Sequence, residues 1–389
     1  MKIIIVSNFL TPHQAPLCEA FNSLPNCEVI FIETYNVDKN SLPIGWRYLD
    51  KPSYLVDYGE YISDLLRYQR EINEADAVIF GAIPYCFIKE RIKNNKPTFF
   101  YTERMYKSWR NIVKLPYHLI KYNYLYHHNC VKLLCASAFA YSDFLMIRCF
   151  KDRAFKWGYF PEYRGYSELE ASLQNASSSE GTTLMWCGRF LRWKHPELPI
   201  KLAALLKKNG YVFYVDMYGA GIELEKTKEL AEELQVSDVV NFKGNLPNED
   251  IQKAMKEHDI FLFTSDKNEG WGAVSNEAMS NGCVLVGSHL IGSIPYLIKD
   301  GINGLVFESG NIESLFKKVI YLIDNPDKRK SMAKEGIMTI KSIWSPIGAA
   351  TSFVNLVNNL QSTENPFKME IDGPCSKAEF YKNNWYKTI

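Results

Sequence analysis

Residues 268–281 read NEGWGAVSNEAMSN, and the predicted fold rests on this segment. It follows residues 259–265, DIFLFTS, an apolar run typical of a buried strand. Gly270 and Gly272 predict a loop at its start, and Gly282 marks the end of a short helix, because glycine commonly terminates helices. The pattern is therefore a strand, a glycine-rich loop and a helix.

Two carboxylates lie in this unit, Glu269 and Glu277, eight positions apart. We expect Glu269 on the loop and Glu277 on the helix, facing one ligand from two sides. In open α/β sheets ligands bind outside the carboxyl ends of the strands, and the free N–H groups of a helix N-terminus favour phosphate. The pattern predicts a phosphorylated ligand with hydroxyls for the carboxylates to bind.

Length and composition limit the classes of protein. A chain of 389 residues predicts two domains, and 47% hydrophobic and 23% charged residues are typical of a globular protein. The formal charge of +1 argues against a nucleic-acid partner. The 24 Tyr, 22 Phe and 8 Trp suit sugar or membrane-interface surfaces, although a packed core accounts for most of them.

The nine cysteines are scattered and include no C-x-x-C pair, so we expect neither disulfides nor a zinc site. The apolar run at the N-terminus is too short for a signal peptide, and no stretch of about twenty apolar residues is present. These features predict a cytoplasmic protein.

Apolar runs alternate with helix-length segments in both halves of the chain. Strands are expected at 2–7, 27–32, 77–80, 98–101, 133–137, 155–161, 183–187, 212–217, 239–242, 260–263 and 284–286. This alternation predicts an α/β fold of two Rossmann-like, doubly wound parallel sheets. The first strand lacks G-x-G-x-x-G after it, which disfavours a dinucleotide-dependent dehydrogenase.

Glu269 and Glu277 also match a family motif. They resemble the E-x7-E motif of retaining, nucleotide-sugar-dependent glycosyltransferases of family 4 (group 1), which have the GT-B fold. Residues 186–194, WCGRFLRWK, resemble the G-R-x4-K phosphate clamp of that family, and residues 301–307, GINGLVF, resemble its d-G-x-N-G-x-x-f turn. The resemblance covers residues 182–345 well and the N-terminal half loosely.

The resemblance implies four parts. These are an N-terminal acceptor-binding domain (1–165), a linker (166–182), a nucleotide-sugar-binding domain (183–344), and a crossover helix with a tail that returns to the N-terminal domain (345–389).

The resemblance also assigns the donor site, with a UDP-sugar as the expected donor. Arg189 and Lys194 would stabilise the departing phosphate, Glu269 would bind the transferred sugar and Glu277 the ribose. The other residues expected at the donor are Gly188, Gly219, Lys243, Gly270, Trp271, Gly272, Ala273 and Val274. Trp271 could equally serve packing.

The chain departs from the family pattern at two places. Gly-Gly-x-x-Glu is replaced by residues 292–296, GSIPY, so Tyr296 stands where the family often has an acid. The N-terminal half also lacks a histidine between residues 81 and 103. His13 and the turn with Glu103 and Arg104 are the expected substitutes that touch acceptor or donor sugar.

Residues 104–132 combine basic and aromatic side chains and contain no acidic residue. Such a mixture suits an anionic membrane surface or a lipid-linked acceptor. The alternative is a basic face whose aromatic side chains point inward.

These observations predict transfer of a sugar, with retention of configuration, to a hydroxyl of a glycan or lipid-linked acceptor in surface polysaccharide or lipooligosaccharide synthesis. The expected protein is a monomer that needs no metal, since no Asp-x-Asp motif is present and basic side chains replace the ion. The alternatives are a nucleotide-sugar epimerase or a phosphorylase on the same fold, and a catalytically silent sugar-nucleotide or glycan-binding partner.

Overall fold

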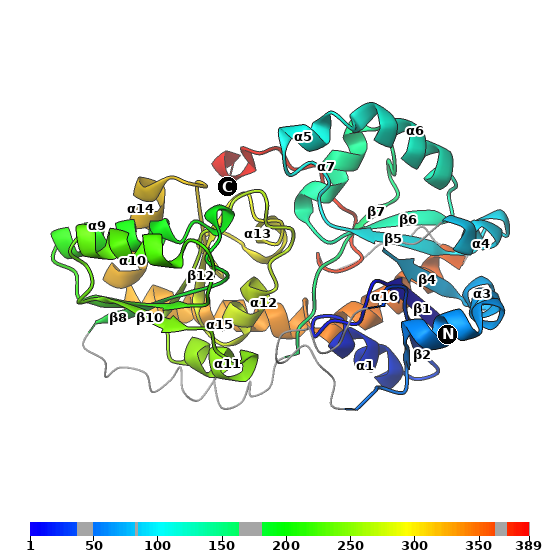
Figure 1. Ribbon diagram of the computed structural model, residues 1–389, viewed down its shortest axis with the longest axis horizontal. Coiled ribbons are helices and arrows are strands. Elements are labelled where there is room, and N and C mark those ends of the chain that lie inside the picture. The colour runs from blue at the N-terminus through cyan, green and yellow to red at the C-terminus, as the bar shows by residue number, and fades with distance from the viewer. Residues whose placement is uncertain (37–49, 82–84, 163–180, 362–371, 389) are drawn as a thin grey trace. The chain divides into compact units, whose positions relative to one another are not determined.

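The structure, a computed structural model, describes residues 1–36, 50–81, 85–162, 181–361 and 372–388. The chain divides into two compact units (Figure 1). Unit 1 comprises Met1–Glu162 and Ile343–Tyr381, and unit 2 comprises Tyr163–Ser342 and Lys382–Ile389. Most of the predicted linker lies outside the described residues. The sequence analysis predicts that residues 345–389 return to the N-terminal domain. In the structure, residues 382–389 belong to unit 2.

Unit 1 contains a parallel sheet of seven strands in the order β3-β2-β1-β4-β5-β6-β7. The strands are β1 (Lys2–Ser7), β2 (Glu28–Glu33), β3 (Leu55–Val56), β4 (Ala77–Phe80), β5 (Thr98–Thr102), β6 (Val131–Cys135) and β7 (Ala154–Lys156). The helices are α1 (Ala15–Ser23), α2 (Tyr58–Ser63), α3 (Leu65–Glu74), η2 (Tyr85–Phe87), α4 (Lys89–Lys93), α5 (Trp109–Ile112), α6 (Leu115–Tyr126), α7 (Ala138–Met146) and α16 (Pro346–Gln361).

The central strands of unit 1 are apolar on both faces because helices cover both. One face packs in a core cluster that includes Phe80 and Phe100 from the sheet and Tyr126 from α6. On the other face Phe353 of α16 contacts Phe99, with ring centroids 4.8 Å apart. The C-terminal helix thus completes the core of unit 1.

Residues 372–381 continue along unit 1 after α16. Lys156 is buried and its Nζ pairs with the Asp372 carboxylate at 2.6 Å. Lys377 forms an antiparallel bridge with Phe155, and Tyr381 exchanges two hydrogen bonds with the Ser142 hydroxyl at 3.0 Å. These contacts hold the tail up to the point where it passes to unit 2.

Unit 2 contains a parallel sheet of six strands in the order β10-β9-β8-β11-β12-β13. The strands are β8 (Thr182–Cys187), β9 (Phe213–Tyr218), β10 (Val240–Gly244), β11 (Ile260–Phe263), β12 (Val284–Ser288) and β13 (Leu305–Phe307). The helices are η3 (Arg192–Lys194), α9 (Glu197–Lys208), α10 (Leu224–Glu233), α11 (Asn248–Lys256), α12 (Val274–Ser280), α13 (Ile294–Leu297), α14 (Ile312–Asp324), α15 (Pro326–Ser342) and η4 (Trp385–Thr388).

The central strands β11 and β12 of unit 2 are buried along their whole length, so both of their faces are covered. Leu184 and Trp186 of β8 pack in a core cluster with residues of α9 and α14. α12 packs against α15, and both helices contact β12. The predicted strand and helix alternation is therefore confirmed, and β3 and β13 are the strands that the sequence did not reveal, because both are very short.

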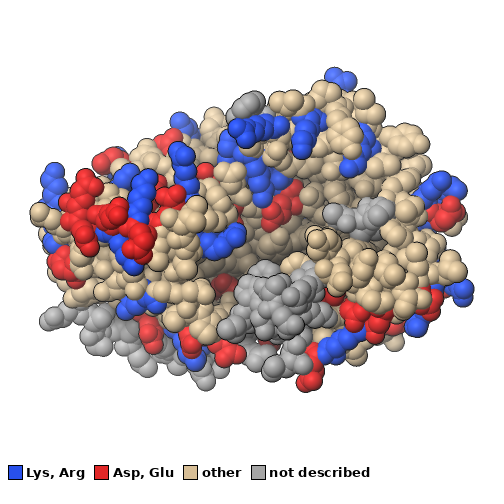
Figure 2. Space-filling view, viewed as in Figure 1, with Lys and Arg blue, Asp and Glu red and all other residues tan. Residues whose placement is uncertain are grey.

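Two regions of the face seen in Figure 2 differ in surface charge. Over α9 and α10 acidic and basic atoms are mixed, whereas over α5 and α6 basic and uncharged atoms predominate (Figure 2). All nine cysteines are free thiols. Within the described ranges, no helix has the length and apolar character needed to cross a bilayer.

Candidate functional site

Three tight turns meet at the carboxyl edge of the unit 2 sheet, after β8, β9 and β10. The Gly188 N–H donates to the Tyr218 carbonyl at 3.0 Å, and the Gly219 N–H donates to the Gly244 carbonyl at 2.7 Å. Gly219 has φ +126°, and a Cβ there would overlap the carbonyl oxygen of Gly188. Only glycine combines this dihedral with this approach. The backbone of the turn after β8 is thereby fixed.

Lys194, at the end of η3, forms an ion pair with Glu269. Glu269 lies in the glycine loop, residues 264–273 between β11 and α12. The Ser265 hydroxyl donates to the same Glu269 oxygen at 2.9 Å. The lysine and glutamate side chains are only 14% and 10% exposed, so the pair is poorly screened by water. The Lys194 carbonyl accepts from the Thr264 hydroxyl at 2.7 Å, which ties η3 to the end of β11.

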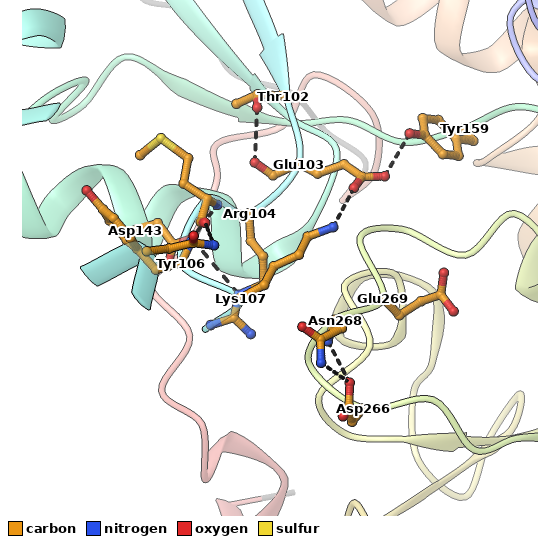
Figure 3. A network of polar contacts seen from close by, with 12 residues as sticks. Thr102, Glu103, Arg104, Tyr106, Lys107, Asp143, Tyr159, Asp266, Asn268 and Glu269 are labelled. Carbon is orange, nitrogen blue, oxygen red and sulfur yellow. Dashed lines mark hydrogen bonds and ion pairs between the residues drawn. The ribbon is translucent and has the colours of Figure 1, made fainter. Parts of the chain in front are cut away.

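His195, the residue after η3, contacts two carboxylates that help to fix this turn. Its φ is +51°, and its ring nitrogens lie 2.8 Å from the Glu197 carboxylate and 3.6 Å from that of Asp266. Asp266 and then Glu197 raise the pKa of His195 to about 9, so the imidazole is charged at neutral pH. Asp266 also accepts two hydrogen bonds from Asn268 (Figure 3). Sequence reasoning missed His195, although it directly follows Lys194.

Glu277 lies on α12, as predicted, and Glu269 on the preceding loop. Glu277 is 7% exposed and accepts a hydrogen bond from the Asn248 amide at 3.2 Å. A Cβ at Gly272, where φ is +82°, would overlap the Phe263 ring. Trp271 is fully buried and its Nε1 donates to Asn276 at 2.8 Å, which favours the packing role over contact with a ligand.

The remaining predicted cations of unit 2 are exposed. Arg189 lies beside Gly188, and its side chain makes no hydrogen bond or ion pair to other residues in the part of the chain that the structure describes. Lys243, on the edge strand β10, pairs with Asp216 at 3.2 Å. Gly270 is buried, and Ala273 and Val274 are half-buried at the start of α12. Among the described residues, no group of three or more His, Cys, Asp or Glu side chains is arranged to hold a metal ion.

Unit 1 has a pocket at the carboxyl ends of β1, β4 and β5. His13, Tyr101 and Tyr159 line it together with Ser7, Gln14, Gly81, Trp157, Gly158 and Phe160 and with apolar side chains of β1, α1 and β4. The His13 ring stacks on the Tyr159 ring at 5.8 Å. Burial raises the pKa of the Tyr159 phenol well above its usual value, so the hydroxyl stays protonated and donates.

Glu103 and Arg104 follow β5 but differ in surroundings. Glu103 accepts from the Tyr159 hydroxyl at 2.7 Å and pairs with Lys107 at 3.0 Å (Figure 3). Arg104 is 8% exposed, lies 4.7 Å from the centroid of the Phe139 ring and approaches Asp143 at 4.0 Å. Glu103 thus adjoins the pocket through Tyr159, whereas the burial of Arg104 favours a structural role.

Comparison with known families identifies the larger part of unit 2. The sequence profile described as glycosyl transferases group 1 matches residues 170–338. The chain carries a group 1 glycosyltransferase domain. This domain contains the η3 turn, the glycine loop and α12.

Curated relatives match part of the chain. The chain is 29% identical over 149 residues to the poly(glycerol-phosphate) alpha-glucosyltransferase of Bacillus subtilis (strain 168), covering 38% of this chain and 21% of that protein. It is 27% identical over 185 residues to the D-inositol 3-phosphate glycosyltransferase of Corynebacterium aurimucosum, covering 46% and 43%. The chain therefore matches less than half the length of either relative.

Solved structures match nearly the whole chain in fold. Anabaena HepE in complex with UDP has a TM-score of 0.67 at 14% identity, over 92% of this chain and all of HepE. The lipopolysaccharide outer core galactosyltransferase WaaB has a TM-score of 0.65 at 16% identity, over 93% of this chain and all of WaaB. Two parallel Rossmann-like sheets with these neighbours define the GT-B fold.

Proposed function

We propose that the protein is a retaining, family 4 glycosyltransferase that moves a sugar from a nucleoside diphosphate, with UDP expected, to a hydroxyl acceptor. The observation that carries this proposal is the Lys194 and Glu269 pair at the carboxyl edge of the unit 2 sheet. Its position, after β8 and β11 and beside a glycine loop, is where open α/β sheets bind ligands. The group 1 domain and the UDP complex of HepE support the same reading.

The chemistry requires stabilisation of negative charge on the departing phosphate. An ammonium has three N–H donors, so Lys194 can keep its bond to Glu269 while it donates to a phosphate oxygen. Arg189, exposed beside it in sequence, can add a second cation. Charge-assisted bonds of this kind contribute roughly 1.5–3 kcal/mol each, which favours leaving-group departure without a metal.

The carboxylates would hold the donor by its hydroxyls. Glu269 would bind the transferred sugar and Glu277 the ribose, with backbone N–H groups of the glycine loop directed at the pyrophosphate. Attack of the acceptor from the face that the leaving group vacates retains the configuration, and the departing phosphate can take the acceptor proton. In this scheme catalysis depends on positioning and electrostatics.

A thermal-shift screen tests the donor. The protein, in EDTA, is heated with UDP, GDP, ADP, CMP and TDP and with common sugar conjugates. We expect UDP compounds to raise the melting temperature by several degrees, because a ligand at a hundred times its Kd adds about 2.7 kcal/mol. A response to free sugars but to no nucleotide would contradict the proposal and support a glycan-binding module. A UDP-sugar converted to its epimer without UDP release would support an epimerase.

For the acceptor we propose a glycan or lipid-linked oligosaccharide of a surface polysaccharide or lipooligosaccharide pathway. The unit 1 pocket supports it, since the Ser7 hydroxyl and the His13 imidazole that line it are groups of the kind that bind sugar hydroxyls. The Glu103 carboxylate adjoins the pocket through its bond to Tyr159. Rhizobium meliloti LpsE, 25% identical over 46% of this chain, is named as a lipopolysaccharide core biosynthesis glycosyltransferase.

We also propose that the α5–α6 face docks on the inner face of an anionic membrane. Large apolar side chains are exposed there, Val113 (70%) in the turn before α6, and Tyr117 (60%), Ile120 (70%) and Tyr124 (76%) along one face of α6. Tyr122 and Tyr126 point the opposite way, into the core of unit 1. Arg110, Lys114 and Lys121 supply positive charge, and Figure 2 shows basic and uncharged atoms over this region. Each such cation near an anionic leaflet contributes roughly 1 kcal/mol.

Vesicle sedimentation tests this face. We expect binding to phosphatidylglycerol vesicles but not to phosphatidylcholine vesicles, and at least about tenfold weaker binding of the variant Ile120→Ser with Tyr124→Ser, because apolar insertion adds to charge attraction. The matched control is Leu66→Ser with Ile222→Ser, which replaces side chains that are 81% and 85% exposed elsewhere. Equal loss in both variants, or no binding by the unaltered protein, would refute the docking face.

A further inference from the structure

The C-terminal segment of the chain docks on unit 2 (Figure 1, red). The Trp385 Nε1 donates a hydrogen bond to the carbonyl oxygen of His289 at 2.9 Å. The Tyr386 ring lies 4.1 Å from the His289 ring, measured between centroids. Burial and then the Glu308 carboxylate raise the pKa of the Tyr386 phenol to about 12. Two adjacent aromatic residues therefore converge on one histidine.

His289 is the first residue after β12, and it is fixed on several sides. Its N–H donates to the Phe307 carbonyl at 3.0 Å, and its Nδ1 accepts from the Ser309 N–H at 2.9 Å. The residue is 6% exposed, and burial holds the pKa of the imidazole below its ordinary value. A neutral ring that accepts at Nδ1 carries its proton on Nε2. His289 is thus a fixed contact point between the tail and the sheet edge.

Residues 289–296 connect this contact to the donor site. The Ser275 hydroxyl of α12 donates to the Ser293 hydroxyl at 3.0 Å, and the Tyr296 ring lies 6.2 Å from that of Trp271 in the glycine loop. Ser275, Ser293 and Trp271 are all fully buried. Residues 289–296, which include the first residues of α13, therefore have the tail against one end and the glycine loop against the other.

We infer that Trp385 and Tyr386 are positioning residues for donor binding, which they support by holding residues 289–296 against the glycine loop. This inference rests on the proposed function, in which the glycine loop binds the donor. Release of the tail would loosen His289 and lower donor affinity. The groups that contact the departing phosphate would stay in place, so KM for the donor would change more than kcat.

The test compares Trp385→Ala with Trp385→Phe, which keeps a ring but loses the hydrogen bond, and with Phe380→Ala, a control for a tail aromatic that is 54% exposed in unit 1. For Trp385→Ala we expect about tenfold weaker UDP binding by calorimetry, a matching rise in KM and faster amide exchange in residues 289–296. In UDP affinity, KM and amide exchange, Trp385→Phe should lie between the unaltered protein and Trp385→Ala. Phe380→Ala should match the unaltered protein.

Unchanged exchange in residues 289–296 of Trp385→Ala, or a kcat loss without a KM change, would overturn the inference. The exchange measurement needs no nucleotide. A different result is possible, in which the unaltered protein binds no nucleotide but Trp385→Ala still accelerates amide exchange only in residues 289–296. In that case the proposed function fails, and the contact of the tail with His289 stands.

Discussion

Replacing Glu269 with glutamine should lower kcat/KM by at least about a hundredfold while the protein remains folded, because a neutral amide can neither balance the Lys194 charge nor bind sugar hydroxyls as a charged acceptor. Lys194→Ala should cost as much, since it removes the cation nearest the leaving phosphate. A turnover assay of UDP release, with melting temperatures for each variant, measures both effects.

The two residues contact each other, so their effects should not multiply. The double variant, Glu269→Gln with Lys194→Ala, should lose less than the product of the single losses. Glu249→Gln and Lys208→Ala, exposed residues of the same unit, are the matched controls and should keep full activity. Full activity in either single site variant would refute the assignment.

Gly219→Ala should be the most destabilising single-methyl change in the site. Its φ of +126° disfavours a side chain, and a Cβ would overlap the Gly188 carbonyl. Strain and overpacking of this kind cost roughly 2–5 kcal/mol together. We expect a large drop in melting temperature and loss of UDP binding, because the turn that carries Arg189 must shift.

Gly210→Ala is the matched control for this effect. Gly210 also has a positive φ, +76°, but nothing lies within 4 Å of the added Cβ. Gly210→Ala should lower the free energy of unfolding by only about 1–2 kcal/mol and leave UDP affinity unchanged. Equal losses in the two variants would show that the contact with Gly188 has no special role.

The sequence predicted the alternation of strands and helices because buried parallel strands are continuous apolar runs. The loop position of Glu269 and the helical position of Glu277 followed from Gly270 and Gly272 alone. The η3 turn could be predicted only from its resemblance to a family motif. The contacts that hold this turn in place could not be predicted. His195 and Asp266 meet across separate loops, a contact that spacing in one sequence does not encode.

The tail shows a second limit of sequence reasoning. Trp385 meets His289 across 96 positions, and neither residue lies in a periodic or motif pattern. The exposed stripe on α6 had a visible signal in its composition, but only the structure separates outward Tyr117 and Tyr124 from inward Tyr122 and Tyr126. The residue types of that segment indicated a basic and aromatic surface. The orientation of α6 decides which of its side chains are exposed on that surface.

Calorimetric titration of UDP into the protein and into Lys194→Ala, both in EDTA, shows whether Lys194 binds the donor phosphate. We expect one site per chain without metal, and at least about tenfold weaker binding in the variant, because one charge-assisted bond to phosphate is lost. Undiminished UDP affinity in Lys194→Ala would contradict the claim that the pair of Lys194 and Glu269 forms the donor site.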